Sequence, residues 1–235
     1  MNTLYTEIIS RSRPEQVAGL SRFFKTGPGQ YGEGDKFLGI KVPVIREAVG
    51  LKWRECSFEN LEECISSEYH EVRLAALLAL IQKFRHSPAS EQKQCIDFYL
   101  SHTDRINNWD LVDLSCYELL GTWLLDKDRS LLYELAEKGK NIWERRIGMV
   151  STMKFLREGQ LEDTYSIAGI FLKDGTELHD LFQKAVGWLL REAGKRDMER
   201  LRFWLEPRRA SMPRIMLRYA IEKFPENERK QMLAR

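Results

Sequence analysis

The chain has 235 residues, of which 43% are hydrophobic and 31% charged, and its formal net charge is +2. This composition allows a sizeable buried core and excludes a globally disordered chain. There is no run of 18 apolar residues and no apolar N-terminal h-region, so the sequence predicts neither a membrane span nor a secretory signal. The four cysteines lack C-x-x-C spacing, which indicates reduced thiols of a cytosolic protein rather than a zinc site or disulfides.

Apolar residues recur with the period of an amphipathic helix in one segment after another, and strand-like alternation is absent. Pro14 divides the first two helical segments, and Pro43 suits the first turn of the third. The expected helical segments are 3–12, 14–25, 42–53, 57–66, 70–85, 90–102, 107–125, 130–139, 141–159, 161–175, 179–197, 198–209 and 211–225.

The glycine-rich stretch 26–35 matches the letters G-x-G-x-x-G at Gly27, Gly29 and Gly32. No β-branched strand precedes it and no long helix starts at its last glycine, so a dinucleotide-binding loop is rejected. We expect a flexible surface loop. The four histidines share no metal-ligand spacing and are expected at the surface or at helix caps.

Several helices begin with a basic residue followed by small and apolar ones, at Arg73, Arg146, Lys184 and Arg214. The interval from Arg73 to Arg146 is about twice each of the other two intervals. The helix that contains Trp109 lies within it and fits as the missing member of the series. A helix pair of roughly 30–40 residues is typical of HEAT-like repeats, which stack into a superhelical solenoid whose inner helices line one concave face. The sequence therefore predicts an all-α fold of antiparallel helix pairs in one domain, 1–235, with an irregular helical bundle as the alternative.

The stretch Asn107–Asp113, Asn-Asn-Trp-Asp-Leu-Val-Asp, opens one of these helices. Trp109 and Asp113 are four residues apart and therefore share a helix face, which Asp110 partly joins. An ordinary explanation also exists, because Asp is common in the first turn of a helix and Trp is common in cores.

Four motifs together resemble the AlkD family of HEAT-like-repeat DNA alkylation-repair glycosylases. They are FLGI at 37–40, WDLVD at 109–113, NIWERR at 141–146 and QKAVGWLLRE at 183–192. The resemblance implies a solenoid that binds DNA on its concave face. Two features depart from the pattern: Phe23 stands where relatives place a Tyr, and the glycine-rich insertion precedes FLGI.

The resemblance also implies roles for individual residues. Asp113 matches the catalytic carboxylate, and Trp109 and Trp188 match the aromatic walls beside the lesion. Arg146 matches a basic residue at the DNA backbone. Arg191 and Lys41 fall near other DNA contacts. Lys184, Arg214 and Arg73, at the basic helix starts, are expected to bind the backbone without sequence preference.

The chemistry of alkylated DNA suits these residues. A purine alkylated at N3 or N7 is cationic and leaves as a neutral base, while positive charge develops on the sugar. A carboxylate stabilises that charge and can orient or deprotonate water, and indole faces attract the cationic base. The expected function is excision of 3-methyladenine and 7-methylguanine. We expect a monofunctional glycosylase without lyase activity, because no lysine stands in WDLVD to form a Schiff base.

The expected partner is double-stranded DNA carrying alkylated bases, with no metal, no organic cofactor and no membrane. We expect a monomer in the cytoplasm of a bacterium, acting at the nucleoid. Two alternatives remain: a non-catalytic relative that binds damaged or branched DNA, and a HEAT scaffold for another protein. The charge distribution favours an anionic partner, because His179–Arg235 holds 14 Lys/Arg against 8 Asp/Glu, a local net charge of +6.

Overall fold

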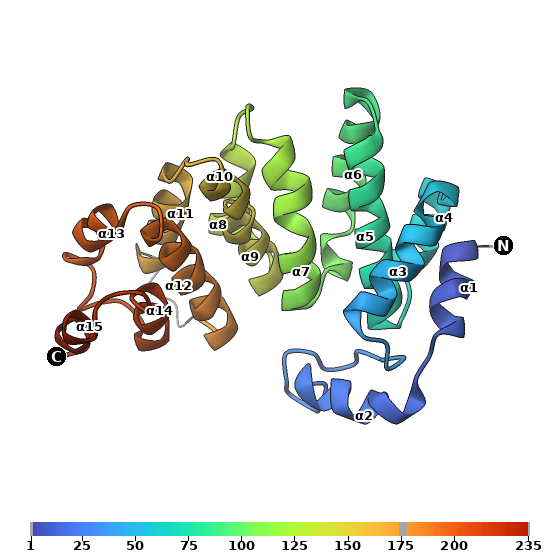
Figure 1. Cartoon of the computed structure of the whole chain (residues 1–235), viewed down its shortest axis with the longest axis horizontal. Coiled ribbons are helices and arrows are strands. Elements are labelled where there is room, and N and C mark those ends of the chain that lie inside the picture. The colour runs from blue at the N-terminus through green and yellow to red at the C-terminus, as the bar shows by residue number, and fades with distance from the viewer. Residues whose placement is uncertain (1, 174–177, 235) are drawn as a thin grey trace. The chain divides into compact units, whose positions relative to one another are not determined.

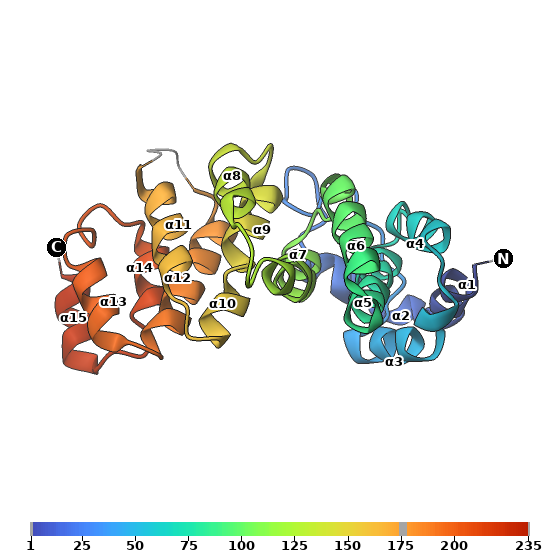
Figure 2. The same cartoon turned by 90° about the horizontal axis from the view of Figure 1, so that it is seen from above.

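The protein is all-α (Figures 1 and 2). Its computed structural model describes residues 2–173 and 178–234. Within these ranges the only β-type pairing is an isolated bridge between Lys36 and Tyr69. Backbone contacts divide the chain into two compact units, Met1–Ser115 and Cys116–Arg235. None of the helices in the described ranges is long and apolar enough to cross a membrane.

The helices of the first unit are α1 (Thr3–Ser10), α2 (Pro14–Phe23), α3 (Val42–Lys52), α4 (Phe58–Ile65), α5 (His70–His86), α6 (Ala89–Ser101) and α7 (Trp109–Cys116, whose last residue lies past the unit boundary). Two 3₁₀ turns, η1 (Trp53–Glu55) and η2 (Thr103–Arg105), join them.

The second unit begins with a π-helical segment, η3 (Tyr117–Gly121), which continues directly from α7. Its α-helices are α8 (Ser130–Lys138), α9 (Ile142–Val150), α10 (Met153–Arg157), α11 (Glu162–Lys173), α12 (Asp180–Gly194), α13 (Met198–Leu205), α14 (Arg214–Ala220) and α15 (Glu226–Leu233).

Helix α5 is the centre of the first unit, where it packs against α1, α3, α4 and α6. Every residue from His70 to Ile81 is buried, as expected for a helix that is apolar on nearly all sides. Its first turn nevertheless carries His70, Glu71 and Arg73, three polar side chains that need partners once they are buried.

Helix pairs stack in the second unit. Helix α8 packs on α9 and α11 on α12, while α9, α12 and α14 are neighbours in one layer. Gly187 permits the close approach of α12 to α14, because a Cβ atom there would lie 2.5 Å from the carbonyl oxygen of Met216. Arg146, Lys184 and Arg214 lie on α9, α12 and α14 of this layer, and of the three only Arg214 is the first residue of its helix.

The sequence predicted the order and type of these helices, and the all-α fold of stacked helix pairs is confirmed. Four details differ. The expected helix 107–125 is α-helical from Trp109 only to Cys116 and continues as the π-helical segment η3. The expected helix 141–159 is broken at residues 151–152 into α9 and α10, α15 was not anticipated, and the loop 26–35 folds back so that Asp35 is buried. Residues 174 and 175 of the expected segment 161–175 lie outside the described ranges. One domain over 1–235 stays a prediction.

Candidate functional site

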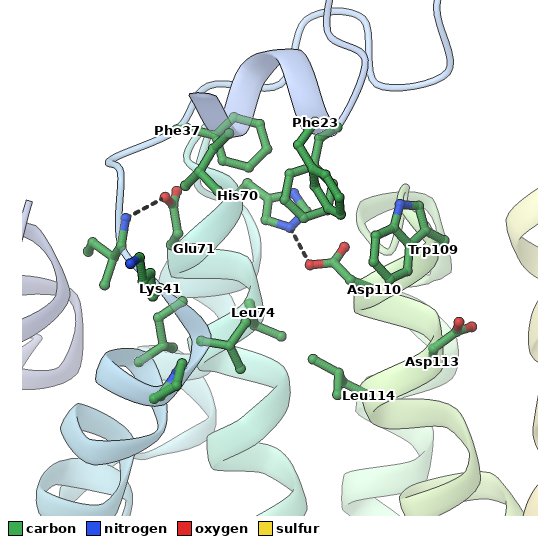
Figure 3. Close-up of a pocket in the computed structure, with 16 residues that line it drawn as sticks. Phe23, Phe37, Lys41, His70, Glu71, Leu74, Trp109, Asp110, Asp113 and Leu114 are labelled. Atoms are coloured by element: carbon green, nitrogen blue, oxygen red, sulfur yellow. Dashed lines mark hydrogen bonds and ion pairs between the residues drawn. The ribbon is translucent and has the colours of Figure 1, made fainter. Parts of the chain in front are cut away.

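A cavity of about 440 Å³ lies in the first unit beside the start of α7 (Figure 3). Its walls come from the end of α2, the segment before α3, and helices α3, α5 and α7. Most of the lining side chains are apolar. The polar and charged ones are Lys41, His70, Glu71, Asp110 and Asp113.

The wall formed by Phe37–Ile40 is anchored by the buried carboxylate of Glu71. Its oxygens accept hydrogen bonds from the backbone N–H groups of Leu38, Gly39 and Ile40 at 2.9, 2.9 and 3.0 Å. Such charge-assisted bonds offset the cost of burying the carboxylate. Gly39 has φ 86°, and a Cβ atom there would lie 2.0 Å from the carbonyl oxygen of Arg13, so the close turn requires glycine.

Four charged side chains form a buried cluster behind this wall, which we call the His70 cluster: Asp35, His70, Arg73 and Asp110. The ring of His70 lies between two carboxylates, with Nδ1 3.1 Å from Asp35 and Nε2 2.8 Å from Asp110. Arg73 donates to Asp35 at 2.6 Å. These side chains are at most 6% exposed, so their mutual pairing is what makes their burial tolerable.

The environment of His70 shifts its pKa upward. Burial lowers the pKa, but the nearby carboxylates of Asp110 and Asp35 raise it more, to about 9. For Asp35, burial raises the pKa, but the neighbouring cations His70 and Arg73 lower it more, so that it lies below the ordinary value. The raised pKa of His70 and the lowered pKa of Asp35 both favour an imidazolium beside the Asp35 carboxylate at neutral pH.

Trp109 is half-buried and is held by residues from α2 and the glycine-rich loop. Phe24 stacks on its ring at 5.6 Å between centroids, with 25° between the planes, and Phe23 meets it edge-on at 5.9 Å. Tyr31 hydrogen-bonds to the Trp109 side chain, which lowers the pKa of Tyr31 against the larger upward effect of burial. The insertion thus supports this ring directly.

Asp113 is half-buried at the edge of the cavity. Trp109 and Asp113 lie one turn apart on one side of α7, whereas Asp110 and Leu114 point toward α5 (Figure 3). The first turns of α7 therefore present an indole and a carboxylate on one side and anchor themselves through Asp110 on the other.

The remaining predicted site residues lie in the second unit. Lys184 and Trp188 are half-buried on α12. The other three donate to partners within that unit: Arg146 to the Leu181 carbonyl at 2.6 Å, Arg191 to Glu222, and Arg214 to the Leu233 carbonyl.

The structure corrects two of the predictions. Arg73 does not line an exposed DNA-binding surface, because its side chain is 3% exposed and engages Asp35, Asn107 and the carbonyls of Ser67 and Glu68. His70 is neither a surface nor a capping residue, because it is 1% exposed. Arg146, at 6% exposed, is also more buried than expected of a basic helix start.

A family model described as "DNA alkylation repair enzyme" matches residues 4–224. The chain belongs to this family. The match spans both units, from the first residues of α1 to the end of the segment that follows α14.

A solved structure supports the fold of this DNA alkylation repair family member. The "Predicted DNA alkylation repair enzyme from Enterococcus faecalis" is similar with a TM-score of 0.70 and 18% sequence identity, covering 92% of this chain and 97% of that one. A comparison with curated proteins finds no match. At this identity the structural similarity shows the fold alone.

Three residues of the site were not identified from the sequence: Asp35, Glu71 and Tyr31. Glu71 had a usable signal, since a carboxylate in the first turn of an otherwise apolar helix must find buried donors. Asp35 and Tyr31 lie in the loop whose path no periodic pattern predicts. Within the described ranges, no group of three or more His, Cys, Asp or Glu side chains could hold a metal ion.

Proposed function

We propose that this protein is a monofunctional DNA glycosylase that excises cationic N3- and N7-alkylated purines, including 3-methyladenine and 7-methylguanine. The observation that carries the proposal is the arrangement on α7, where the Trp109 ring and the Asp113 carboxylate lie one turn apart beside an aromatic cavity. Membership of the DNA alkylation repair family gives the general substrate.

Asp113 would act on the sugar. As the alkylated base leaves, its positive charge passes to the deoxyribose, and a fixed carboxylate nearby stabilises that charge. The same carboxylate can orient or deprotonate the attacking water. The water supplies the hydroxyl that replaces the base, and the base leaves neutral, so the reaction needs no further reactant.

Trp109 would hold the cationic base by cation–π contact, worth about 0.5–2 kcal/mol and more when water is excluded. Trp188 stays a predicted aromatic contact to the base. The supports of Trp109 fit this role, because Phe24 and Tyr31 hold its ring before any substrate arrives. The cavity is lined mostly by apolar side chains. It therefore provides few hydrogen-bond donors to read a neutral base such as uracil or hypoxanthine.

The residues that would bind the DNA backbone are the predicted contacts other than the buried Arg73. They are Lys41, Arg146, Lys184, Arg191 and Arg214. Arg191 pairs with Glu222, and Lys41 is exposed. Ion pairs at a surface contribute little to stability, so Arg191 can exchange its partner for a phosphate at small cost.

The test is base release from matched duplexes that carry 3-methyladenine, 7-methylguanine, uracil, hypoxanthine or 8-oxoguanine. We expect release of the two cationic bases alone, and its loss in Trp109→Ala. Binding without release would favour the alternative of a non-catalytic DNA-binding relative. Absence of DNA binding in an electromobility assay would favour a protein scaffold, and efficient release of uracil would refute the mechanism.

A further inference from the structure

We propose that His70 is a positioning residue for the reaction: by joining Asp110 of α7 to Asp35 of the glycine-rich loop, it holds the first turn of α7, and with it Trp109 and Asp113, in the reactive geometry. This inference rests on the proposed glycosylase function. His70 itself lies behind the cavity wall and acts through other residues.

The contacts of the ring require both of its nitrogens to donate. Nδ1 faces Asp35 Oδ2 at 3.1 Å and Nε2 faces Asp110 Oδ2 at 2.8 Å. Ionised carboxylates only accept hydrogen bonds, whereas a neutral imidazole has one donor and one acceptor nitrogen. A neutral ring would therefore leave one carboxylate facing a lone pair at short range. The imidazolium is the form that satisfies both sides.

The charges around the ring lead to the same conclusion. The loop contributes Asp35, α7 contributes Asp110, and α5 contributes Arg73, which pairs with Asp35 at 2.6 Å. Glu71, also on α5, uses its carboxylate on the backbone of Leu38, Gly39 and Ile40. With His70 protonated the two carboxylates face two cations. Without that proton, His70 no longer compensates the charge of Asp110, which is only 6% exposed.

Two paths connect His70 to the reactive side of α7. One is Asp110, the residue directly after Trp109 and three before Asp113 (Figure 3). The other is a stack of rings, in which Phe24 lies 4.9 Å from His70 and 5.6 Å from Trp109 between centroids. A displacement of the first turn of α7 therefore moves both proposed catalytic side chains together.

The size of the expected effect follows from the sensitivity of catalysis to geometry, in which a displacement of about 1 Å can cost about 100-fold in rate. Loss of the imidazolium should slow base release by about 10- to 100-fold. DNA affinity should change little, because the side chains of the His70 cluster are at most 6% exposed. The effect belongs to the chemical step and should leave the dissociation constant within about twofold.

The first experiment measures single-turnover release of 3-methyladenine and duplex affinity for the wild type, His70→Gln and the matched control His102→Gln. His102 pairs with Glu62 away from the cavity. We expect His70→Gln to lose rate and keep affinity, and His102→Gln to keep both. A folded His70→Gln protein with the wild-type rate overturns the proposal. A wild type that binds DNA and releases no base refutes the glycosylase function, and the positioning role is then judged by NMR alone.

The second experiment needs no substitution of His70. NMR signals of the His70 ring and of the Trp109 indole N–H are followed in the wild-type chain from pH 6 to 10. The pKa of His70 is raised to about 9, so we expect the ring to titrate near that pH and the Trp109 signal to move with it. In Asp110→Asn, both transitions should shift to lower pH. If the Trp109 signal does not change while His70 titrates, the positioning role is overturned, whatever the base-release activity of the protein.

Discussion

The first unit holds a buried cluster of charged side chains that pair with one another, whereas the ion pairs of Arg191 and Arg200 in the second unit are partly exposed. The side chains of the His70 cluster are 2–6% exposed. In the second unit, the Arg200–Glu162 pair is 35% and 75% exposed, and the Arg191–Glu222 pair 19% and 43%.

Buried and partly exposed ion pairs suit different roles. A buried network of mutually paired charges resists rearrangement, because moving one partner leaves the other charge without compensation. Surface pairs contribute little and are screened by salt, so their arginines can release a glutamate and take a phosphate. In the function we propose, a fixed geometry suits the reaction at Trp109 and Asp113, and exchangeable ion pairs suit contacts to phosphate.

The largest expected effect is on the chemistry of the first unit. Asp113→Asn should lower base release by about 10²–10⁴-fold, because the amide carries no charge and cannot act as a base. Fold and DNA affinity should persist, since the two side chains have nearly the same shape. Single-turnover kinetics with an electromobility assay measures both, with the exposed Asp104→Asn as control. A variant as active as the wild type would remove Asp113 from the mechanism.

Next in size is a pH-dependent stability that arises from the His70 cluster of the first unit. The folded-state pKa of His70, about 9, lies above its ordinary value of 6.5. The stabilisation is therefore fully present below pH 6.5 and is lost as the pH rises through 9. The difference between these two pKa values corresponds to about 3 kcal/mol in the free energy of unfolding.

Urea unfolding of the wild type and His70→Gln at pH 6.5, 8 and 9.5 measures this effect, with His102→Gln as control. The difference between wild type and His70→Gln should shrink across this range. A constant difference would mean that the imidazolium is not what the cluster stabilises.

A smaller effect is expected at the wall of the cavity. Glu71→Gln keeps the size of the side chain but removes the charge from three backbone hydrogen bonds and adds an N–H group beside their donors. We expect a loss of about 1–3 kcal/mol in the free energy of unfolding. Chemical denaturation measures it, and Glu68→Gln, at an exposed pair with Lys36, is the control. Equal losses in both variants would contradict a special role for the buried carboxylate.

The smallest effect should come from the second unit. Lys184→Glu should weaken binding to every duplex alike and reduce the slope of log affinity against log salt by about 1. Fluorescence anisotropy at several salt concentrations measures this, with Lys230→Glu as a control of equal charge change on α15. A slope unchanged in Lys184→Glu would show that Lys184 does not contact phosphate.

Much of the fold was predictable because it depends on local patterns. Apolar period, Pro14 and Pro43 located the helices within a few residues, and the recurring basic helix starts indicated stacked pairs. The break between α9 and α10 had no comparable signal. Trp109 and Asp113 were identified because they are four residues apart on one helix, a spacing that alone sets their common face.

The sequence by itself determined most of the helices, the family and the shared face of Trp109 and Asp113. The tertiary structure alone decided which charges are buried, and so turned Arg73 from a predicted DNA contact into a structural cation and His70 from a surface residue into the centre of a cluster. Asp35, His70 and Asp110 are separated by 35 and 40 residues along the chain. Their pairing depends on how a non-periodic loop folds onto two helices, and no local preference of those residues specifies that path.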